Sequence, residues 1–476
     1  MSENQINEAV YTLKNSGNYT PLMTIVTTHV SEILEIDINA HYNKKICGAL
    51  IERVRSVEFG IRILLRRKSE IEENFKKSDY LDNFENFTKT LIDIKKFVAN
   101  ITQFQRFKFF KADEVKENFL QLTKKFDACM NVLGFAMLTD QEKLKQIDDE
   151  SLQDDLNEMT EFIGYIECYQ EYREVSTPNE LIEIPIIHPT KLQDPSNSLQ
   201  ANKHPTILKK KLLPDNREVA CKSFLHDVSQ FKNTLEILIK ASLCPKILKF
   251  YGISKIDNNN YLIFEWAEMG NLKEVYEKYS ITWTTKISFA LDIFRAILFL
   301  DSHTMFHHDI RCENVLVTSK LESKLTNFRF ARMKDDVTNY INQDRESLRW
   351  MAPEKMLDYE KENIVRYTYK CELFSFGMLL WELAFEKTPY DGKNLADIIT
   401  HVTKGGREEI PVYSSDELEE AKICQEFTRI IKDVWAHEPG NRISPSKLFI
   451  ELSNLKNKYT TDKLTMPLLE KKQPTT

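Results

Sequence analysis

Two polar side chains five residues apart, within HHDIRCENVLV at His307–Val317, are suited to chemistry on a phosphate. Asp309 could orient a hydroxyl group and accept its proton, and Asn314 offers an amide oxygen that can hold a magnesium ion. Farther upstream, VACK at Val219–Lys222 ends in a lysine that could pair with the α- and β-phosphates of a nucleotide. A carboxylate, an amide and a lysine of this kind make chemistry on a phosphate group a candidate function.

Three more features follow these residues in order along the chain. WMAPE lies at Trp350–Glu354, FSFGMLLWEL at Phe374–Leu383, and Arg442 comes later. Together with the motifs above, they resemble protein kinases of the tyrosine-kinase-like class over about residues 203–458. The resemblance implies an α+β bilobal protein-kinase fold. It also implies a buried ion pair between Glu354 and Arg442 that has a structural role.

The same resemblance indicates where a nucleotide would bind. CPKILKFYGI at Cys244–Ile253 is similar to the strand that follows helix C in kinases. YLIFEWAEMGNL at Tyr261–Leu272 is similar to the strand that leads into the hinge. The resemblance therefore implies that ATP is bound by Lys222, by Phe264 at the gatekeeper position, and by the hinge residues Glu265–Ala267.

Several positions depart from the kinase pattern where phosphates and metal would bind. The glycine-rich loop is expected at Lys203–Leu213, but no glycine lies between Gly164 and Gly252. Backbone amides approach phosphates closely only where no Cβ intervenes. The aspartate of the DFG motif is replaced by Asn327, whose neutral oxygen lowers the electrostatic part of the metal affinity. Arg329 replaces the glycine of that motif and adds a positive charge.

Three further positions bear on activity. FKNTLEILIK at Phe231–Lys240 is similar to helix C, and it carries Thr234 where kinases have a glutamate; a shifted register would offer Glu236 instead. The arginine of the HRD motif is His308, which argues against switching by a phosphorylated activation loop. The aspartate expected before SFG is Glu372.

These departures predict a pseudokinase that retains Asp309 and Asn314 but carries Asn327 in place of the main metal ligand. Asn314 and Asn327 are expected to bind a metal only weakly, so ATP binding is predicted to be weak or absent and Mg²⁺ binding is in doubt. One alternative is an active Ser/Thr protein kinase of the tyrosine-kinase-like class with unusual metal ligation. Another is a scaffold that binds no nucleotide.

The first 172 residues are predicted to be helical, because apolar side chains recur every three or four residues. Such stripes run through Leu50–Leu64, Phe84–Ile101 and Phe119–Ala136, and an earlier helix is expected near Val26–Ile38. Four amphipathic helices must bury their stripes against one another, so a four-helix bundle is expected. A further polar helix at Asp148–Tyr172 is expected to brace the bundle.

The domain organisation follows from these patterns. A proline-rich linker is expected at residues 173–202, and a polar tail at residues 459–476. A helical bundle joined by a brace to a defective kinase domain resembles the mixed lineage kinase domain-like proteins. The resemblance implies that the bundle is an effector, binding protein partners, self-associating or touching membranes, and that the pseudokinase is its switch. Residues Arg66–Lys68 and Lys76–Lys77 could contact anionic lipid.

Charge and composition bear on the partners and the cellular compartment that we expect for this chain. The net charge of −7 gives no global basic field, so nucleic acid is not an expected partner. The eight cysteines form no CxxC pair, which is typical of reduced thiols in a cytoplasmic protein. The N-terminal ten residues are polar, unlike a signal peptide, and no run of 18 apolar residues could span a bilayer.

Overall fold

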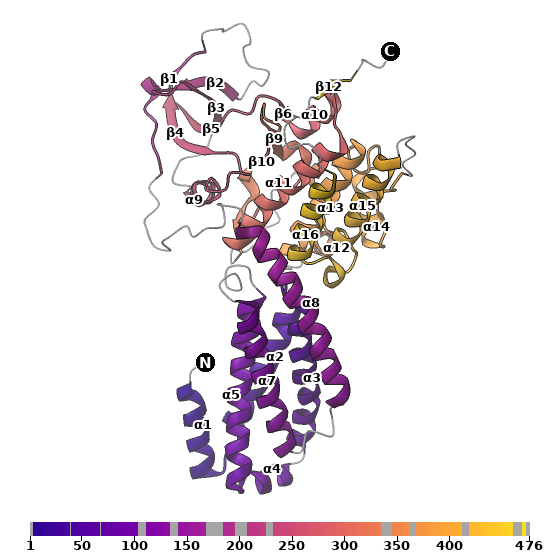
Figure 1. Cartoon of the computed structure of the whole chain (residues 1–476). Coiled ribbons are helices and arrows are strands. Elements are labelled where there is room, and N and C mark those ends of the chain that lie inside the picture. The colour runs from indigo at the N-terminus through magenta and orange to yellow at the C-terminus, as the bar shows by residue number, and fades with distance from the viewer. Residues whose placement is uncertain are drawn as a thin grey trace. The chain divides into compact units, whose positions relative to one another are not determined.

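The computed structural model describes residues 3–38, 40–66, 68–102, 111–133, 141–167, 184–195, 207–224, 232–334, 345–361, 367–411, 418–459 and 469–472. The chain forms two compact units, and the boundary between them lies between Ile166 and Glu167 (Figure 1). The first unit is all-α and the second is α+β, which agrees with the predicted fold class.

The helices of the first unit follow the predicted apolar stripes. The four expected bundle helices correspond to α2, α3, α5 and α7, and the expected brace corresponds to α8; the structure adds α1 and α4. Residues 134–136 and 168–172 of the predicted helices lie outside the described residues. The bounds are α1 Glu3–Ser16, α2 Thr20–Ile38, α3 Lys44–Arg66, α4 Lys68–Phe75, α5 Ser78–Ile101, α7 Ala112–Val132 and α8 Gln141–Glu167.

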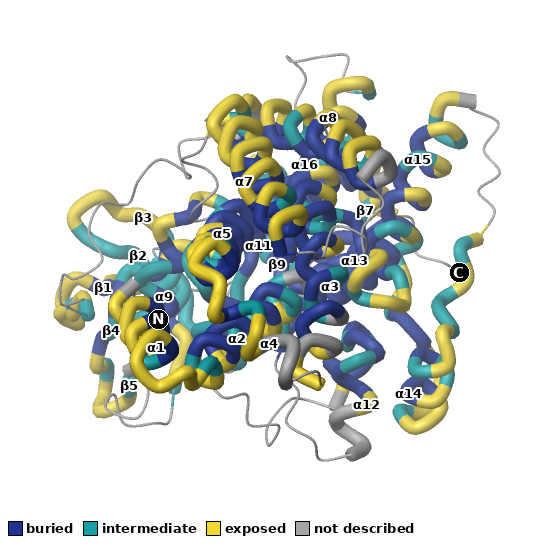
Figure 2. Tube along the Cα trace, turned by 90° about the horizontal axis from the view of Figure 1, so that it is seen from below, coloured by how far each residue is buried: buried dark blue, intermediate teal, exposed yellow. Residues whose placement is uncertain are grey.

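Aromatic rings fill the centre of this helical unit. Phe84 and Phe87 of α5 are fully buried, with ring centroids 5.9 Å apart, and the ring of Phe87 lies 5.9 Å from that of Phe126 on α7. Buried and exposed residues alternate along these helices (Figure 2), as expected when one face of each helix is buried. The predicted stripes are therefore the faces that meet in the core, as the hydrophobic effect requires.

A buried arginine joins three helices of this unit. Arg53 of α3 donates two hydrogen bonds of 2.7 Å to Asp148 of α8, and its Nε lies 3.2 Å from a carboxylate oxygen of Asp127 on α7. Near the start of α3, the backbone N–H of Ile46 donates a 2.8 Å hydrogen bond to Asp155 of α8. Burial raises the pKa of Asp155 to about 7. These polar contacts fasten α8 to α3.

The second unit begins with an antiparallel five-stranded sheet in the order β1-β2-β3-β5-β4, accompanied by helix α9 at Lys232–Ala241. The strands are β1 Leu192–Gln193, β2 Ile207–Leu212, β3 Arg217–Phe224, β4 Phe250–Ile256 and β5 Asn259–Glu265. Side chains alternate between the two faces of a sheet. Val219, Cys221 and Ile263 pack together with Leu192 on one face.

A helical lobe follows the sheet. Its helices are α10 Leu272–Lys278, α11 Trp283–Ser302, α12 Pro353–Lys361, α13 Tyr369–Phe385, α14 Leu395–Thr403, α15 Leu418–Val434 and α16 Pro445–Tyr459. Its short strands are β6 Gly270–Asn271, β7 Tyr279–Ser280, β8 Met305–Phe306, β9 Val315–Val317, β10 Ser323–Leu325, β11 Arg332–Met333 and β12 Glu470–Lys471. The central helix α13 is buried along almost its whole length.

Part of the segment expected to be a linker is built into the sheet. β1 pairs with β2. In the residues before β1, the carbonyl of Pro185 accepts a 2.9 Å hydrogen bond from the N–H of Ile253, and the N–H of Ile187 donates one of 2.8 Å to the carbonyl of Ile253. Proline lacks a donor, but its carbonyl and its neighbours still bond to an edge strand. Gly252 is needed here, because a Cβ at that position would collide with the carbonyl of Pro185. Residues 173–183 and 196–202 lie outside the described residues.

The segment Lys203–Leu213, where the glycine-rich loop is expected, is mostly a strand and not a loop. Residues 207–212 form strand β2, while residues 203–206 lie outside those described. The connections before Lys222 are residues 194–206, between β1 and β2, and residues 213–216, between β2 and β3. Neither contains glycine, so the expected lack of a glycine cradle still follows from the sequence.

Part of the expected polar tail is ordered on the helical lobe. β12 pairs with β7, and Lys472 Nζ contacts the Tyr276 carbonyl at 2.7 Å and a carboxylate oxygen of Glu386 at 2.5 Å. Residues 460–468 and 473–476 lie outside the described part of the chain. A charged tail can therefore dock through main-chain bonds and one ion pair, although its composition predicts exposure.

We expect the substitution Arg53→Ala to lower the free energy of unfolding of the helical unit by about 3–5 kcal/mol, because Asp148 and Asp127 would lose their buried partner. Arg62→Ala on the same helix is the control. Arg62 is exposed and pairs with Glu58 one turn away, so its loss should cost about 0.5 kcal/mol or less. Differential scanning calorimetry of the full chain measures both, and equal shifts in melting temperature would contradict the assignment.

Candidate catalytic and nucleotide-binding site

The backbone of the segment that contains Asp309 is held by a buried carboxylate. Glu372, in the first turn of α13, accepts hydrogen bonds of 2.9 Å from His307 N and 2.8 Å from His308 N. The hydroxyl of Tyr367 donates a third, of 2.6 Å. Glutamate thus supports the loop at the position where the sequence analysis expects aspartate.

Asp309 itself is buried, and only part of its carboxylate is engaged. One oxygen lies 3.2 Å from Nε of Arg311, while Oδ2 has no hydrogen-bond partner among the described residues. Asp309 lines a small cavity together with His308, Ser347 and Trp350. An ionised carboxylate with one free oxygen can still accept a hydrogen bond from a hydroxyl group.

The two asparagines expected to bind metal instead bond to each other. Asn327 Nδ2 donates a 2.9 Å hydrogen bond to Asn314 Oδ1, and Asn314 Nδ2 donates one of 2.8 Å to the carbonyl of Asp309. Asn327 adopts a left-handed conformation with φ of 68°. Asp309, Asn314 and Asn327 thus lie together, and the amide oxygen of Asn314 accepts a hydrogen bond from Asn327.

These residues do not fit a magnesium site of the kinase type. Mg²⁺ requires oxygen ligands and is normally held through carboxylates, whereas here two neutral amides satisfy one another. Among the residues that the structure describes, no group of three or more His, Cys, Asp or Glu side chains could hold a metal ion.

His308 is neutral and buried in place of the HRD arginine. Its ring stacks on that of Tyr367, with centroids 3.8 Å apart, and its backbone φ is 66°. Burial lowers the pKa of His308 to about 3, so the ring carries no charge at neutral pH. It cannot attract a phosphorylated activation loop as an arginine would.

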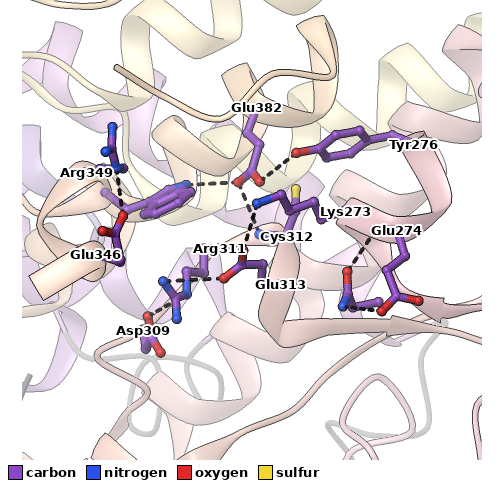
Figure 3. Close-up of polar contacts among 12 residues, drawn as sticks. Lys273, Glu274, Tyr276, Asp309, Arg311, Cys312, Glu313, Glu346, Arg349 and Glu382 are labelled. Atoms are coloured by element: carbon purple, nitrogen blue, oxygen red, sulfur yellow. Dashed lines mark hydrogen bonds and ion pairs between the residues drawn. The ribbon is translucent and has the colours of Figure 1, made fainter. Parts of the chain in front are cut away.

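A second buried carboxylate on α13, which the sequence analysis missed, links four segments of the helical lobe (Figure 3). Glu382 accepts hydrogen bonds from Cys312 N at 3.2 Å, Trp350 Nε1 at 2.9 Å and the Tyr276 hydroxyl at 3.2 Å. Burial raises the pKa of Glu382 to about 7. The sequence does contain a signal for this role, a glutamate within the apolar run FSFGMLLWEL, because a carboxylate that is buried needs hydrogen-bond donors around it.

Lys222 lies on β3 without a carboxylate partner. Its ammonium group makes no hydrogen bond or ion pair with any other residue described by the structure, including Thr234 and Glu236 of α9. The residue is open to solvent, yet surrounding atoms desolvate its ammonium group, and this effect and the charge of Arg329 lower the pKa of Lys222. The lysine therefore lacks the ion pair that kinases make with helix C.

The expected hinge residues lie at the end of β5 and directly after it. Phe264 pairs across the sheet with Ala220 and lies 5.3 Å, between ring centroids, from Phe250. Glu265 receives two hydrogen bonds, of 2.7 and 2.8 Å, from Lys324 Nζ. Ala267 is buried. Phe264 thus lies close to Lys222 through β3, while no hydrogen bond among the described residues joins this group to Asp309.

The predicted structural ion pair is present. Arg442 donates to both carboxylate oxygens of Glu354, at 2.7 and 2.8 Å, and also donates to the carbonyl of Lys370 at 2.6 Å. The arginine is fully buried, and its charge and hydrogen bonds hold the pKa of Glu354 below its usual value despite burial.

Comparison with known proteins decides the family. A family model for protein tyrosine and serine/threonine kinases matches residues 202–452, which is more than half of the chain. The chain belongs to this protein kinase family. The match confirms the predicted kinase fold, and kinase domains of this family in general use ATP and Mg²⁺ for phosphoryl transfer.

Three relatives illustrate the similarity. Tyrosine-protein kinase csk-1 of Caenorhabditis elegans is 25% identical over 45% of this chain and 38% of its own length. A probable LIM domain-containing serine/threonine-protein kinase of Dictyostelium discoideum is 28% identical over 51% of this chain and 24% of its own. The proto-oncogene tyrosine-protein kinase ROS of Gallus gallus is 28% identical over 44% of this chain and 9% of its own. The chain thus spans well under half of the length of these kinases.

Within the residues that the structure describes, no helix combines the length and the apolar character needed to cross a membrane.

We expect Glu382 to make the stability of the helical lobe pH-dependent. Its pKa is raised on folding from 4.5 to about 7, so the folded protein holds a proton that the unfolded chain has lost. The stability contributed by this group is therefore fully present below about pH 4.5 and falls as the pH rises through about 7.

The variants Glu382→Gln and Glu382→Ala test this expectation through melting temperatures between pH 5 and 8. The side-chain amide of the glutamine variant can accept from Cys312 and Trp350 and donate to Tyr276, so its stability should be nearly independent of pH relative to wild type. The alanine variant leaves three donors unpaired and should lose about 2–4 kcal/mol. A wild-type protein whose pH profile matches that of Glu382→Gln would show that Glu382 keeps its charge throughout.

Proposed function

We propose that this chain is a signalling pseudokinase in which the kinase-like unit binds ATP at most weakly and controls the output of the helical unit. The observation that carries the proposal is the hydrogen bond between Asn327 and Asn314, which joins two neutral amides where phosphoryl transfer needs a charged metal ligand. The missing glycine cradle and the unpaired Lys222 support the same conclusion. Each such loss typically lowers the rate of transfer by about a hundredfold or more.

The supporting frame of the kinase-like unit is nevertheless complete. Glu372 and Arg442 are buried, and both oxygens of the Glu372 and Glu354 carboxylates accept hydrogen bonds. A unit that keeps its shape while losing chemical groups suits a switch. The alternative, an active Ser/Thr protein kinase of the tyrosine-kinase-like class, rests on the retained Asp309 with its free carboxylate oxygen.

The output would come from the helical unit. The two-part architecture is similar to that of mixed lineage kinase domain-like proteins, and the helical unit has its own compact core. In this proposal the protein acts in the cytoplasm, and the bundle binds protein partners or further copies of itself. Peripheral contact with anionic membranes is a second route for the bundle, since Arg66, Lys76 and Lys77 are exposed. Arg67 lies outside the described residues.

We expect ATP to raise the melting temperature of the full chain slightly, and by the same amount with Mg²⁺ as with EDTA. Asn327→Asp should add a Mg²⁺-dependent component, because a carboxylate would then lie beside the amide oxygen of Asn314, and two facing acceptors favour a cation between them. Asn259→Asp, an equal charge change at an exposed position on β5, is the control. A wild-type protein stabilised by ATP only in the presence of Mg²⁺ would favour the active-kinase alternative.

We also expect residues 1–172 alone to self-associate or to bind a protein that the full chain binds less well. Light scattering and sedimentation with anionic liposomes compare the isolated unit with the full chain. If the isolated unit stays monomeric and binds neither lipid nor any protein bound by the full chain, the effector role is wrong. Asp309→Asn is the complementary variant, since it leaves this behaviour unchanged unless catalysis is the output.

A further inference from the structure

The C-terminal residues 470–472 complete the end of helix α10. This helix is only seven residues long, and the last carbonyls of any helix have no partner within it. Lys472 supplies two of the missing donors. Its backbone N–H donates a 2.9 Å hydrogen bond to the carbonyl of Lys278, and its Nζ donates one of 2.7 Å to the carbonyl of Tyr276. The helix dipole favours a cation at this end. The segment therefore acts as a cap that comes from a distant part of the sequence.

The carboxylate that receives Lys472 is held in place by a second lysine. Glu386 follows α13, and its Oε1 lies 2.9 Å from Nζ of Lys286, which is buried on α11 and also donates a 2.9 Å hydrogen bond to the carbonyl of Ala384. The other oxygen of Glu386 lies 2.5 Å from Lys472 Nζ. Together with the edge of β7, to which β12 pairs, this carboxylate forms a docking site for an extended segment that carries a lysine (Figure 1).

Tyr276 connects this docking site to the segment that carries Asp309. Its carbonyl accepts the hydrogen bond from Lys472, while its hydroxyl donates one of 3.2 Å to Glu382 on α13. Glu382 in turn accepts a 3.2 Å hydrogen bond from the backbone N–H of Cys312, which follows Asp309 closely in the chain (Figure 3). A movement of α10 at Tyr276 would therefore change the support of this segment.

A second route leads from the same helix to Asp309. Lys273 Nζ donates a 2.9 Å hydrogen bond to Glu313, and the other carboxylate oxygen of Glu313 lies 3.5 Å from a guanidinium nitrogen of Arg311. Nε of Arg311 lies 3.2 Å from a carboxylate oxygen of Asp309. These side chains form a continuous row in Figure 3. Helix α10 thus supports the backbone after Asp309 through Tyr276, and the side chain of Asp309 through Lys273.

Residues 470–472 are only lightly held, so their docking can be reversed without unfolding the helical lobe. β12 has only two residues, and the side chains of Glu470 and Lys471 are exposed. Lys472 is itself 41% exposed. An ion pair at such a position contributes little to stability and is weakened by salt. Segments of this kind open locally at a much lower free energy than the core does.

We propose that residues 470–472 are a regulatory strap: when docked, they steady α10 and the segment that carries Asp309, and when released, they leave both more mobile. Loss of the Lys472 charge releases the strap, because a neutral side chain no longer bridges the carbonyl of Tyr276 and the carboxylate of Glu386. The inference goes beyond the proposed function and is independent of it, since the strap acts alike on the helical lobe of a pseudokinase and of an active kinase.

The test is hydrogen exchange of the full chain at low salt, read by mass spectrometry. The variants are Lys472→Gln and the conservative Lys472→Arg, with Lys471→Gln as matched control, because Lys471 is the exposed neighbour on β12. We expect Lys472→Gln to speed exchange about threefold or more in α10 and in residues 307–317 but not in β5, since a charge-assisted hydrogen bond is lost. Lys472→Arg and Lys471→Gln should stay within about twofold of wild type. Deletion of residues 469–476 removes the main-chain bond as well and should give a larger effect than Lys472→Gln.

Each outcome either supports the strap or overturns it. Faster exchange in both α10 and residues 307–317, with β5 unchanged, supports the proposal. Acceleration confined to α10 overturns the link to Asp309. Equal exchange of wild type, Lys472→Gln and the deletion variant overturns the docking itself. Acceleration that includes β5, or that Lys471→Gln causes to the same degree, shows a general loss of stability or charge and also overturns the strap. The ATP titrations that test the proposed function are separate measurements, so the two proposals can fail separately.

Discussion

The kinase-like unit depends on two buried carboxylates that project from one helix. Glu372 and Glu382 lie ten residues apart on α13 and accept hydrogen bonds from three backbone N–H groups of the segment His307–Cys312. An isolated buried carboxylate would be strongly unfavourable, so each is stable only because the loop supplies its donors. The same bonds prevent the loop from leaving its position. The shape of the site is therefore set by α13, which takes no part in the chemistry.

This dependence explains how the unit can lose catalytic groups without losing its fold. Of the residues that hold the backbone, Glu372, Glu382 and Arg442 are buried, and Glu354, the partner of Arg442, is partly buried. The positions that depart from the kinase pattern include Arg329, which is exposed and bears little on the core. Changes at such positions cost little stability, whereas changes at the buried carboxylates leave donors unpaired.

The sequence predicted best what depends on periodicity. Stripes of Phe and Leu located α5 and α7, because burial of one helix face is a local property of the pattern. Helix α1 was not predicted, although its buried residues Ile6, Val10 and Leu13 have the same spacing. Its apolar stripe covers only two turns and lies among polar residues, so the periodicity is weak. Strand β1 was missed because proline-rich composition indicates loops, while its pairing with β2 depends on residues that are distant in the chain.

The motif residues of the site were found by their types, but their contacts were beyond the sequence. Asp309, Asn314 and Asn327 were singled out by residue type, yet the hydrogen bond between the two amides and the left-handed backbone at Asn327 could not be predicted from the sequence. Likewise, the role of Glu382 required knowing that Trp350 and Tyr276 approach α13 from different segments. Such non-local juxtapositions follow from tertiary packing alone.

The amide pair and Arg329 are best understood together. Removing one carboxylate from a cleft that keeps its lysine shifts the local charge by one positive unit, and Arg329 in place of glycine shifts it by another. Each replacement makes the local charge less favourable for a divalent cation. The mutual hydrogen bond of Asn314 and Asn327 then satisfies two polar groups that would otherwise lose their ligand. The asparagine at position 327 and the arginine at position 329 therefore act in the same direction on the charge of this segment.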